Sequence, residues 1–272
     1  MEDATEVNRA HWDAVAAVHG EGEDAYYDVD ALRRGQSSLR AAELGALAAV
    51  GQVTGKDVLH VQCHLGFDSV SLARQGARVT GLDYSAASVA KARRIAEQCG
   101  VDVTFVEADS TAIPDSLHGR FDVAYATIGV LGWIEDVDAW MRSVASTLRP
   151  GGRLLLVELH PLFCMFASLD PLVADFPYAH AGPVVFDEPG TYAAPDAELA
   201  ATRTVEFAHS VGEVVTGAAR AGLRVDQLVE QLDSDFDPRG NVLVLEADDR
   251  YRLRLGGQPT PVLYTLIAAR PD

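Results

Sequence analysis

Apolar and polar positions alternate along the middle of the chain in two different periods, which predict strands alternating with helices. Continuous apolar runs mark strands at 57–61, 77–82, 103–107, 121–127 and 153–159. Between them, apolar residues recur three or four positions apart, as on one face of a helix, and the predicted helices span 66–75, 86–99 and 134–148. Strands that are apolar throughout and alternate with helices are typical of a parallel sheet covered on both faces.

The pattern is different before and after this repeat. Residues 5–18 and 37–50 have apolar positions at helical spacing, and they predict two helices before the first strand. Residues 161–203 are rich in Pro, Phe, Tyr and Asp and show no clear period. An insertion of this length is usually a lid or a binding loop, although it could also be a surface excursion that packs its own aromatic side chains.

The end of the chain completes a predicted sheet of seven strands. A capping box at Ser210 and Glu213 begins a helix, and strands follow at 224–230 and 262–269. No convincing crossover helix joins these two strands, so we expect an antiparallel pair at the sheet edge. The predicted fold class is therefore α/β, with a three-layer, doubly wound, seven-stranded and mostly parallel sheet whose last strand is antiparallel.

Charge and cysteine content narrow the function. The formal net charge is −18 and Lys and Arg form no run, so neither a nucleic acid nor an anionic membrane is an expected partner. The three cysteines have no metal-like spacing and are expected to be reduced thiols of a cytoplasmic protein. The start, MEDATEVNRAHWD, has no apolar core of a signal peptide, and no apolar run approaches the length of a membrane span.

The turn after the first strong strand suggests the ligand. It reads Gln62-Cys63-His64-Leu65-Gly66 and keeps one glycine, whereas dinucleotide-binding loops have three so that the backbone can touch a pyrophosphate. An adenosine-bearing ligand without phosphates would still fit. Because ligands of such sheets bind beyond the carboxyl ends of the strands, Asp83 and Asp109, after the second and third strands, could accept hydrogen bonds from ribose hydroxyls and an adenine amino group. S-adenosylmethionine has these groups.

A family resemblance supports this hypothesis. The succession VLHVQCHLG, VTGLDYS, FVEAD, FDVAYATIGVLGW and LRPGGRLLLVELHP resembles class I S-adenosylmethionine-dependent methyltransferases, and more closely a bacterial subgroup with an LHxQCHxG loop. The resemblance implies a reversed final strand, a ribose contact for Asp83 and an adenine contact for Asp109. The loop lacks the acid and two glycines of the usual signature, so the resemblance does not define how the methionine end is held.

The resemblance also implies a division of the chain. We expect an N-terminal helical cap (1–50), a Rossmann-like core that binds S-adenosylmethionine (51–160), a lid or substrate insertion (161–203) and the C-terminal part of the core sheet (204–272). Tyr26 could close over the sulfonium cation, or it could simply pack. The predicted cofactor-binding residues are Tyr26, Gln62, His64, Gly66, Asp83, Tyr84, Ser85, Asp109, Ser110 and Thr127.

Three residues are candidates for catalysis. Methyl transfer requires alignment of the acceptor with the methyl group, and a base helps only when the acceptor is protonated. His160 follows the fifth strand and is expected to face the cleft, where Glu158 could orient it or bind substrate. His209 precedes a helix, whose dipole disfavours its protonated form. Each histidine could instead have a structural role, in a turn or at the helix start.

These observations lead to one favoured function and several alternatives. We expect a methyltransferase of bacterial specialised metabolism that uses S-adenosylmethionine to methylate N or O of a small neutral or cationic acceptor, as a monomer or homodimer. The same fold could instead support cyclisation, aminocarboxypropyl transfer or C-methylation, or it could be a non-catalytic binding module. The missing glycines disfavour a nicotinamide enzyme, and no His, Cys or acid set has the spacing of a metal site.

Overall fold

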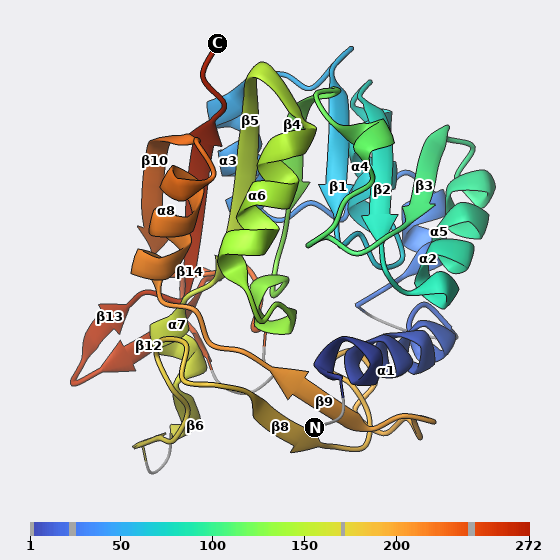
Figure 1. The fold of residues 1–272 in the computed structure, drawn as a ribbon. Coiled ribbons are helices and arrows are strands. Elements are labelled where there is room, and N and C mark those ends of the chain that lie inside the picture. Colours follow the sequence, from blue (N-terminus) through green and yellow to red (C-terminus); the bar gives the residue numbers. More distant parts are fainter. Residues whose placement is uncertain (1–2, 22–25, 170–171, 239–242) are drawn as a thin grey trace.

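The computed structural model describes residues 3–21, 26–169, 172–238 and 243–272. Its main sheet has seven strands in the order β10-β14-β5-β4-β1-β2-β3, and β14 runs antiparallel to both of its neighbours while the other pairs are parallel (Figure 1). This arrangement confirms the predicted fold class. The strands are β1 Asp57–Val61, β2 Arg78–Asp83, β3 Val103–Glu107, β4 Phe121–Ala126, β5 Leu148–Leu159, β10 Arg224–Gln231 and β14 Leu263–Ala269.

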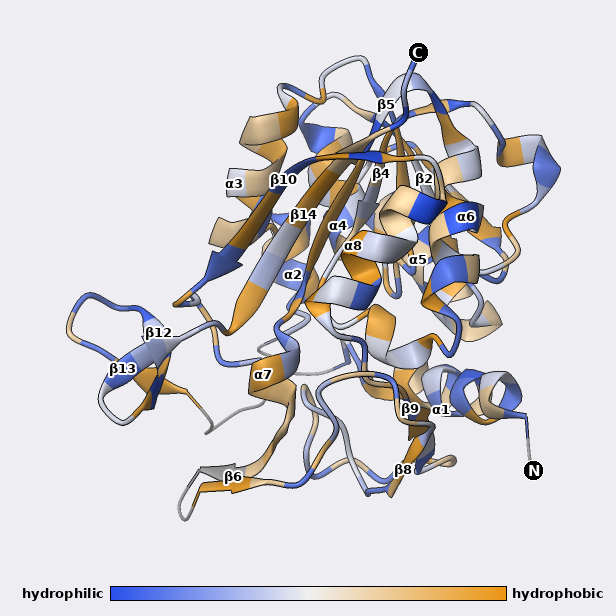
Figure 2. Cartoon of the chain, turned by 60° about the vertical axis from the view of Figure 1, so that its left-hand side comes forward, coloured by the Kyte–Doolittle hydropathy of each residue, from blue (hydrophilic) through white to orange (hydrophobic). Residues whose placement is uncertain are grey.

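Helices cover both faces of the inner strands of this sheet, which explains why these strands are largely apolar, whereas the edge strand β10 is mostly exposed. Val58 of β1 belongs to a buried cluster on the side of α3, whereas Leu59 and Val61 belong to a cluster on the side of α6 and α8. All three side chains are fully buried. Figure 2 shows the hydrophobic colour concentrated in the sheet strands. The helices are α3 Ala41–Val50, α4 Phe67–Arg74 and α5 Ala86–Gln98 on one face, and α6 Val137–Thr147 and α8 Val211–Arg220 on the other.

The local signals at helix ends are confirmed, with one difference in the extent of a strand. Ser85 caps α5, and Ser210 and Glu213 form the capping box of α8. Strand β5 begins at Leu148, not at 153, because the segment around Pro150 pairs with the start of β4. The proline and glycines that end the helix therefore lie inside the strand.

The cap and the insertion lie at the carboxyl ends of β1 and β2 (Figure 1). The N-terminal part contains α1 Ala4–Val18 and the short helix α2 Val29–Arg33, and α1 contacts α5 and β9. The insertion has no clear period in the sequence, yet short segments of it pair into two antiparallel two-stranded sheets. Its elements are α7 Pro161–Cys164, β6 Phe166–Leu169, β7 Leu172–Ala174, β8 Val184–Asp187 and β9 Arg203–Glu206.

A small second sheet precedes the last strand. We predicted no strand between 230 and 262, but β11 Val244–Leu245, β12 Tyr251–Leu255 and β13 Gln258–Thr260 form three antiparallel strands. Among the described helices, none is both long enough and apolar enough to cross a membrane.

Candidate active site

A cavity of about 1140 Å³ lies at the carboxyl ends of the sheet strands. Its wall includes Trp12 of α1, His64 of the loop after β1, Thr127 after β4 and Phe186 of β8, so the cap, the core and the insertion all contribute to it. This is the place where open α/β sheets bind their ligands.

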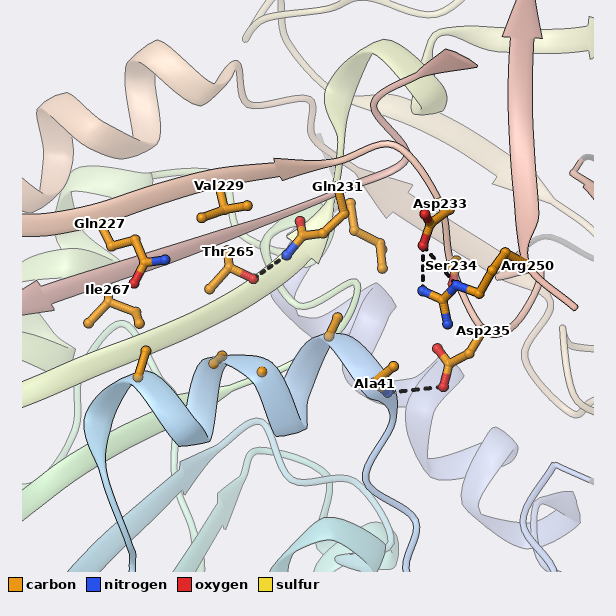
Figure 3. A pocket seen from close by; sticks show the side chains of 15 residues that line it. Ala41, Gln227, Val229, Gln231, Asp233, Ser234, Asp235, Arg250, Thr265 and Ile267 are labelled. Atoms are coloured by element: carbon orange, nitrogen blue, oxygen red, sulfur yellow. Dashed lines mark hydrogen bonds and ion pairs between the residues drawn. The ribbon is translucent and has the colours of Figure 1, made fainter. Parts of the chain in front are cut away.

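A second, smaller pocket lies elsewhere and fits a ligand less well. It has a volume of about 320 Å³ and lies between α3 and the strands β10 and β14 (Figure 3). Its charged side chains mostly bond to one another or to the backbone: Arg250 pairs with Asp233, and one oxygen of Asp235 accepts a hydrogen bond from the backbone N–H of Ala41. None of the residues predicted to bind cofactor or substrate lines it. We therefore take the large cavity as the candidate active site.

The loop after β1 is a compact turn that needs its one glycine for packing. Gln62, His64 and Gly66 have positive φ angles of 57°, 46° and 71°. A Cβ atom on Gly66 would lie 2.8 Å from the Phe105 ring and 3.2 Å from the Cβ of Ala92 in α5. Gly66 thus allows the helices to approach the sheet closely, which is the role of the third glycine in dinucleotide loops.

The side chain of Gln62 connects this loop to the opposite face of the sheet. Its Oε1 accepts a hydrogen bond from Trp140 Nε1 at 2.8 Å, and its Nε2 donates to the Val130 carbonyl at 3.0 Å. Gln62 also lines the cavity. Its amide is therefore fixed against α6 and the segment after β4.

Asp83 is a buried carboxylate at the end of β2 that is held by backbone groups. Its two oxygens accept the N–H groups of His64 at 2.8 Å and Ser85 at 2.9 Å. Burial nevertheless raises the pKa of Asp83 to about 6, and the charge of Asp13 contributes in the same direction. Further hydrogen-bond donors, such as the two hydroxyls of a ribose, would stabilise its charged form.

The strand-end residues predicted to bind adenosine do not line the cavity, because α1 lies over them. Asp13 of α1 accepts hydrogen bonds from Ser85 Oγ at 2.6 Å and from the Ala87 N–H at 3.2 Å, and the Arg9 guanidinium lies 5.9 Å from the centre of the Tyr84 ring. Five of the predicted cofactor-binding residues do not line the cavity: Asp83, Tyr84, Ser85, Asp109 and Ser110. Asp83 still contacts one cofactor candidate that does line the cavity, because it accepts the His64 N–H.

Asp109 is held locally at the end of β3. Its Oδ1 accepts the backbone N–H of Thr111 at 2.7 Å and the Thr111 hydroxyl at 2.8 Å. The neighbouring Ser110 is buried, and so is the hydroxyl oxygen of Tyr84, which has no hydrogen-bond partner among the described residues.

The cavity also contains two acids that the sequence analysis missed, the half-buried Asp68 and the buried Glu43. Asp68 accepts hydrogen bonds from Ser38 Oγ at 2.5 Å, Tyr125 OH at 3.1 Å and Thr127 Oγ1 at 3.3 Å. Glu43 of α3 is buried, and this burial together with the charge of Asp68 raises the pKa of Glu43 to about 8. Polar positions in an amphipathic helix normally face solvent, so only the packing of the helices against the sheet identifies these acids.

A guanidinium group lies in the same cavity. Arg40 is centred 5.1 Å from the Tyr26 ring and 4.1 Å from the Phe236 ring, and its backbone N–H donates to Glu43. Arg40, Glu43 and Asp68 all line the cavity together with Tyr26. Both signs of charge are therefore available to a ligand with a carboxylate and an ammonium group.

A chain of hydrogen bonds joins the loop, the cap and the insertion. His64 contacts His19 at 3.0 Å between ring nitrogens, and His19 contacts Thr191 Oγ1 at 2.7 Å. The hydroxyls of Tyr27 and Tyr192 lie 2.6 Å apart. Burial lowers the pKa of His64 well below its usual value. His64 is thus a neutral part of the cavity wall under the cap.

His160 does not face the cavity, contrary to expectation. Its Nδ1 accepts the Leu162 N–H at 3.2 Å, which caps α7, and its Nε2 lies 2.8 Å from Glu230 Oε1. The side chain is absent from the cavity lining. Pro161 begins α7 directly after His160, so the helix cap turns the imidazole towards β10 and leaves it unable to reach a ligand in the cavity.

Glu158 lines the cavity but does not contact His160. Its carboxylate accepts the backbone N–H groups of Gly129 at 2.5 Å, Leu131 at 2.8 Å and Leu159 at 2.7 Å. Burial raises its pKa, and these hydrogen bonds oppose the shift. Glu158 therefore fixes the segment after β4, which forms part of the cavity wall.

His209 lines the cavity with one ring nitrogen free to accept a hydrogen bond. Its Nε2 lies 2.6 Å from the Ile134 carbonyl oxygen and must donate to it. Its Nδ1 is buried and has no partner among the described residues. Burial lowers the pKa of His209, although the bond to Ile134 opposes the shift. Of the three catalytic candidates, only His209 both lines the cavity and has a buried ring nitrogen without a hydrogen-bond partner among the described residues.

Within the described ranges, no three His, Cys, Asp or Glu side chains lie close enough together to hold a metal ion. The large cavity thus combines buried acids, one guanidinium group, aromatic rings and a neutral histidine. This is a set suited to an organic ligand with both charged and flat apolar parts.

Comparison with known proteins identifies a domain within the chain. Residues 58–152 match the family model described as "Methyltransferase domain". The ubiquinone biosynthesis O-methyltransferase of Xanthomonas axonopodis is 32% identical over 142 residues, which are 52% of this chain and 59% of that protein. The protein of the same name from Erwinia tasmaniensis is 34% identical over 106 residues, 39% of this chain and 43% of that protein. The chain thus spans about half the length of the curated relatives it matches.

Solved structures share the whole architecture at lower sequence identity. An S-adenosylmethionine-dependent methyltransferase from Mesorhizobium loti has a TM-score of 0.54 and 22% identity, covering 85% of this chain and 98% of that chain. The 1,6-didemethyltoxoflavin-N1-methyltransferase of Burkholderia thailandensis, solved with S-adenosylhomocysteine, has a TM-score of 0.56 and 15% identity, covering 100% and 92%. The chain therefore has the fold of the class I S-adenosylmethionine-dependent methyltransferases, and its residues 58–152 match the methyltransferase-domain family.

Proposed function

We propose that this protein is an S-adenosylmethionine-dependent methyltransferase that acts on a small-molecule acceptor. The observation that carries the proposal is Asp83, a buried carboxylate at the end of β2 whose oxygens are fixed by the backbone of the loop after β1 and by the start of α5. The match of residues 58–152 to methyltransferase domains supports it. We also propose that the protein belongs to the bacterial subgroup of class I methyltransferases whose loop after the first strand reads LHxQCHxG.

The adenosine end of the cofactor would bind at the strand ends. Asp83 would accept the ribose hydroxyls and Asp109 the adenine amino group, with Tyr84, Ser85 and Ser110 around them. Because Asp13 of α1 now bonds Ser85 and Ala87, this binding requires α1 to move outward. The N-terminal helix would then act as a cap that opens for the cofactor.

The methionine end would bind among the charged groups of the cavity. Arg40 would pair with the carboxylate of the cofactor, and Asp68 and Glu43 with its ammonium group. An ammonium group also offsets the repulsion that raises the pKa of Glu43. Tyr26, Gln62, His64, Gly66 and Thr127 would surround this end. In this pose, the contacts to the methionine end take the place of the acid that the usual class I methyltransferase signature has in the loop after the first strand.

A ligand lacking the amino-acid part tests this pose. We expect Asp68→Asn to weaken binding of S-adenosylhomocysteine about tenfold or more, the scale of one lost charge-assisted contact, and to leave binding of 5′-methylthioadenosine unchanged. Asp115→Asn, at a fully exposed acid, is the matched control for calorimetry. Equal losses for both ligands would contradict the pose.

The protein would contribute to the reaction by aligning the acceptor with the methyl group and by excluding water from the cavity. When bound, the cofactor supplies a methyl group on a sulfonium. The cap and the insertion close over the loop through His19, Thr191, Tyr27 and Tyr192, so an acceptor in the cavity would be shielded from solvent. The relatives named O-methyltransferases favour oxygen as the acceptor atom, while nitrogen stays an alternative.

Product analysis distinguishes this function from other uses of the same cofactor. The protein is incubated with S-adenosylmethionine and a bacterial small-molecule extract, and products are identified by mass. Methyl transfer produces S-adenosylhomocysteine and an acceptor enlarged by CH₂, whereas aminocarboxypropyl transfer produces 5′-methylthioadenosine. Absence of any product would favour a binding module. We place the protein in the bacterial cytoplasm and in specialised metabolism, consistent with its net charge of −18 and its small number of cysteines.

A further inference from the structure

We propose that the acceptor is a flat aromatic compound with a phenolic hydroxyl, and that this hydroxyl binds Nδ1 of His209, which takes its proton. The inference rests on the proposed function and names the substrate class of the same cavity. It depends on the composition of the cavity wall and on the hydrogen bonds of one histidine.

The aromatic residues of the chain are concentrated in this one cavity. Eleven of the twenty Phe, Trp and Tyr residues line it, and they come from the cap, the core and the insertion. Such walls favour flat rings, which can stack or pack edge to face with them. The eleven are Trp12, Tyr26, Tyr27, Phe67, Trp133, Phe176, Phe186, Tyr192, Phe207, Phe236 and Tyr264.

The hydrogen bonds of His209 define which of its nitrogens can accept a proton. The Ile134 carbonyl can only accept, so Nε2 carries the hydrogen and Nδ1 carries a lone pair. The side chain is 8% exposed, it lines the cavity, and Nδ1 has no partner among the described residues. A buried acceptor without a partner is costly, so a ligand hydroxyl that donates to Nδ1 completes the site.

The surroundings of His209 select an acidic hydroxyl. Burial lowers the pKa of His209, and the nearby His180, 5.9 Å away ring to ring, acts in the same direction. Proton transfer to a weak base is more favourable from a comparatively acidic group, such as a phenol, than from an aliphatic alcohol. The proton moves from the phenol oxygen to Nδ1, leaving a phenolate and an imidazolium that Glu213 and Asp136 stabilise.

Simple probes test the two parts of the inference without the natural acceptor. We would titrate the protein, saturated with S-adenosylhomocysteine, with 2-naphthol, 2-methoxynaphthalene and cyclohexanol. We expect 2-naphthol to bind most tightly, about tenfold better than its methyl ether, which cannot donate to Nδ1. His209→Gln should abolish this difference, and His180→Gln, a change in the histidine stacked behind it, should preserve it.

A spectroscopic measurement follows the proton itself. The absorbance of naphtholate should appear at lower pH in the wild-type complex than in the His209→Gln complex, because only the wild type has Nδ1 to take the proton. Equal binding of 2-naphthol and its ether to the wild type would overturn the role of His209. Equal binding of cyclohexanol and 2-naphthol would overturn the proposal that the acceptor is aromatic. Both comparisons use the wild type, so neither depends on whether a variant folds.

Failure of the proposed function would be recognised separately. Binding of S-adenosylhomocysteine is measured first in the wild type. If it does not bind while the naphthol probes behave as expected, the acceptor site stands and the cofactor assignment fails. If it binds and the probes are not distinguished, the cofactor assignment stands and the inference about the acceptor fails.

Discussion

At the scale of single residues, Gly66 illustrates how the loop after β1 differs from a dinucleotide loop. Glycine is required there by its positive φ and by the Phe105 ring, which would lie 2.8 Å from an added Cβ atom, and neither requirement involves a ligand. The two missing glycines are those that would allow a pyrophosphate to touch the backbone. Retention of only the packing glycine is consistent with a ligand that has no phosphates.

Substitution of Gly66 distinguishes the effect of close packing on stability from the effect of the positive φ angle. Gly66→Ala should lower the free energy of unfolding by about 1–3 kcal/mol more than Gly100→Ala, because of the overpacking it causes. Gly100 is the matched control, since its φ of +66° is similar and nothing lies within 4 Å of the added Cβ. The two variants are compared by denaturant unfolding, and equal losses would show that the close approach of Phe105 is unimportant.

The buried carboxyl of Glu43 gives a prediction about pH. Its pKa of about 8 in the folded protein lies above the value of about 4.3 in an unfolded chain. The folded state therefore binds more protons between these values, and the free energy of unfolding falls as the pH rises through this window. Glu43→Gln cannot titrate, so its stability relative to the wild type should increase from about pH 5 to about pH 8.

Denaturant unfolding at several pH values checks this, with Glu97→Gln, at an exposed position of α5, as the control. The control should show no such trend relative to the wild type. A stability difference between Glu43→Gln and the wild type that is constant across the window would show that Glu43 is not destabilised by burial beside Asp68.

At the scale of helices and strands, the sequence predicts the core elements well because the signals that mark them either repeat along the element or act between residues close in the chain. A strand buried on both faces must be apolar throughout, as Val58 and Leu59 show, and cap residues such as Ser85 and Ser210 act within one helical turn. The two small sheets of the insertion are different. Their strands are short, β7 is exposed throughout and β8 alternates between exposed and half-buried residues, so no long apolar run marks them.

The candidate site is less predictable than the elements that carry it. The sequence locates Asp83 and Asp109 because strand ends of a parallel sheet meet at one edge. It cannot show that α1 lies over them, that a cap turns His160 away, or that helix packing brings Asp68 and Glu43 together. These arrangements depend on contacts between residues far apart in the chain.

The position of α1 leads to a prediction for this element. If α1 must move before the cofactor reaches Asp83, Asp13→Ala should increase the association rate of S-adenosylhomocysteine in stopped-flow experiments, because it removes the bonds to Ser85 and Ala87. Glu6→Ala, an exposed change on the same helix, is the control. An unchanged association rate would indicate that α1 does not limit access to the site.

At the scale of the whole molecule, cap, core and insertion all line one large cavity, rich in aromatic side chains, at the edge where the parallel strands end. The acidic surface, with a formal net charge of −18, is unsuited to anionic polymers and leaves the enclosed cavity as the site where chemistry is expected. The central claim is that this end of the sheet binds S-adenosylmethionine through Asp83.

Calorimetric titration with S-adenosylmethionine, S-adenosylhomocysteine and NAD tests this claim most directly. The wild type and Asp102→Ala, a change at an exposed acid, should bind both sulfur-containing ligands and not NAD. Asp83→Ala should weaken their binding about tenfold or more, the scale of the lost hydrogen bonds to the ribose. Binding of NAD, or unchanged affinity in Asp83→Ala, would contradict the account.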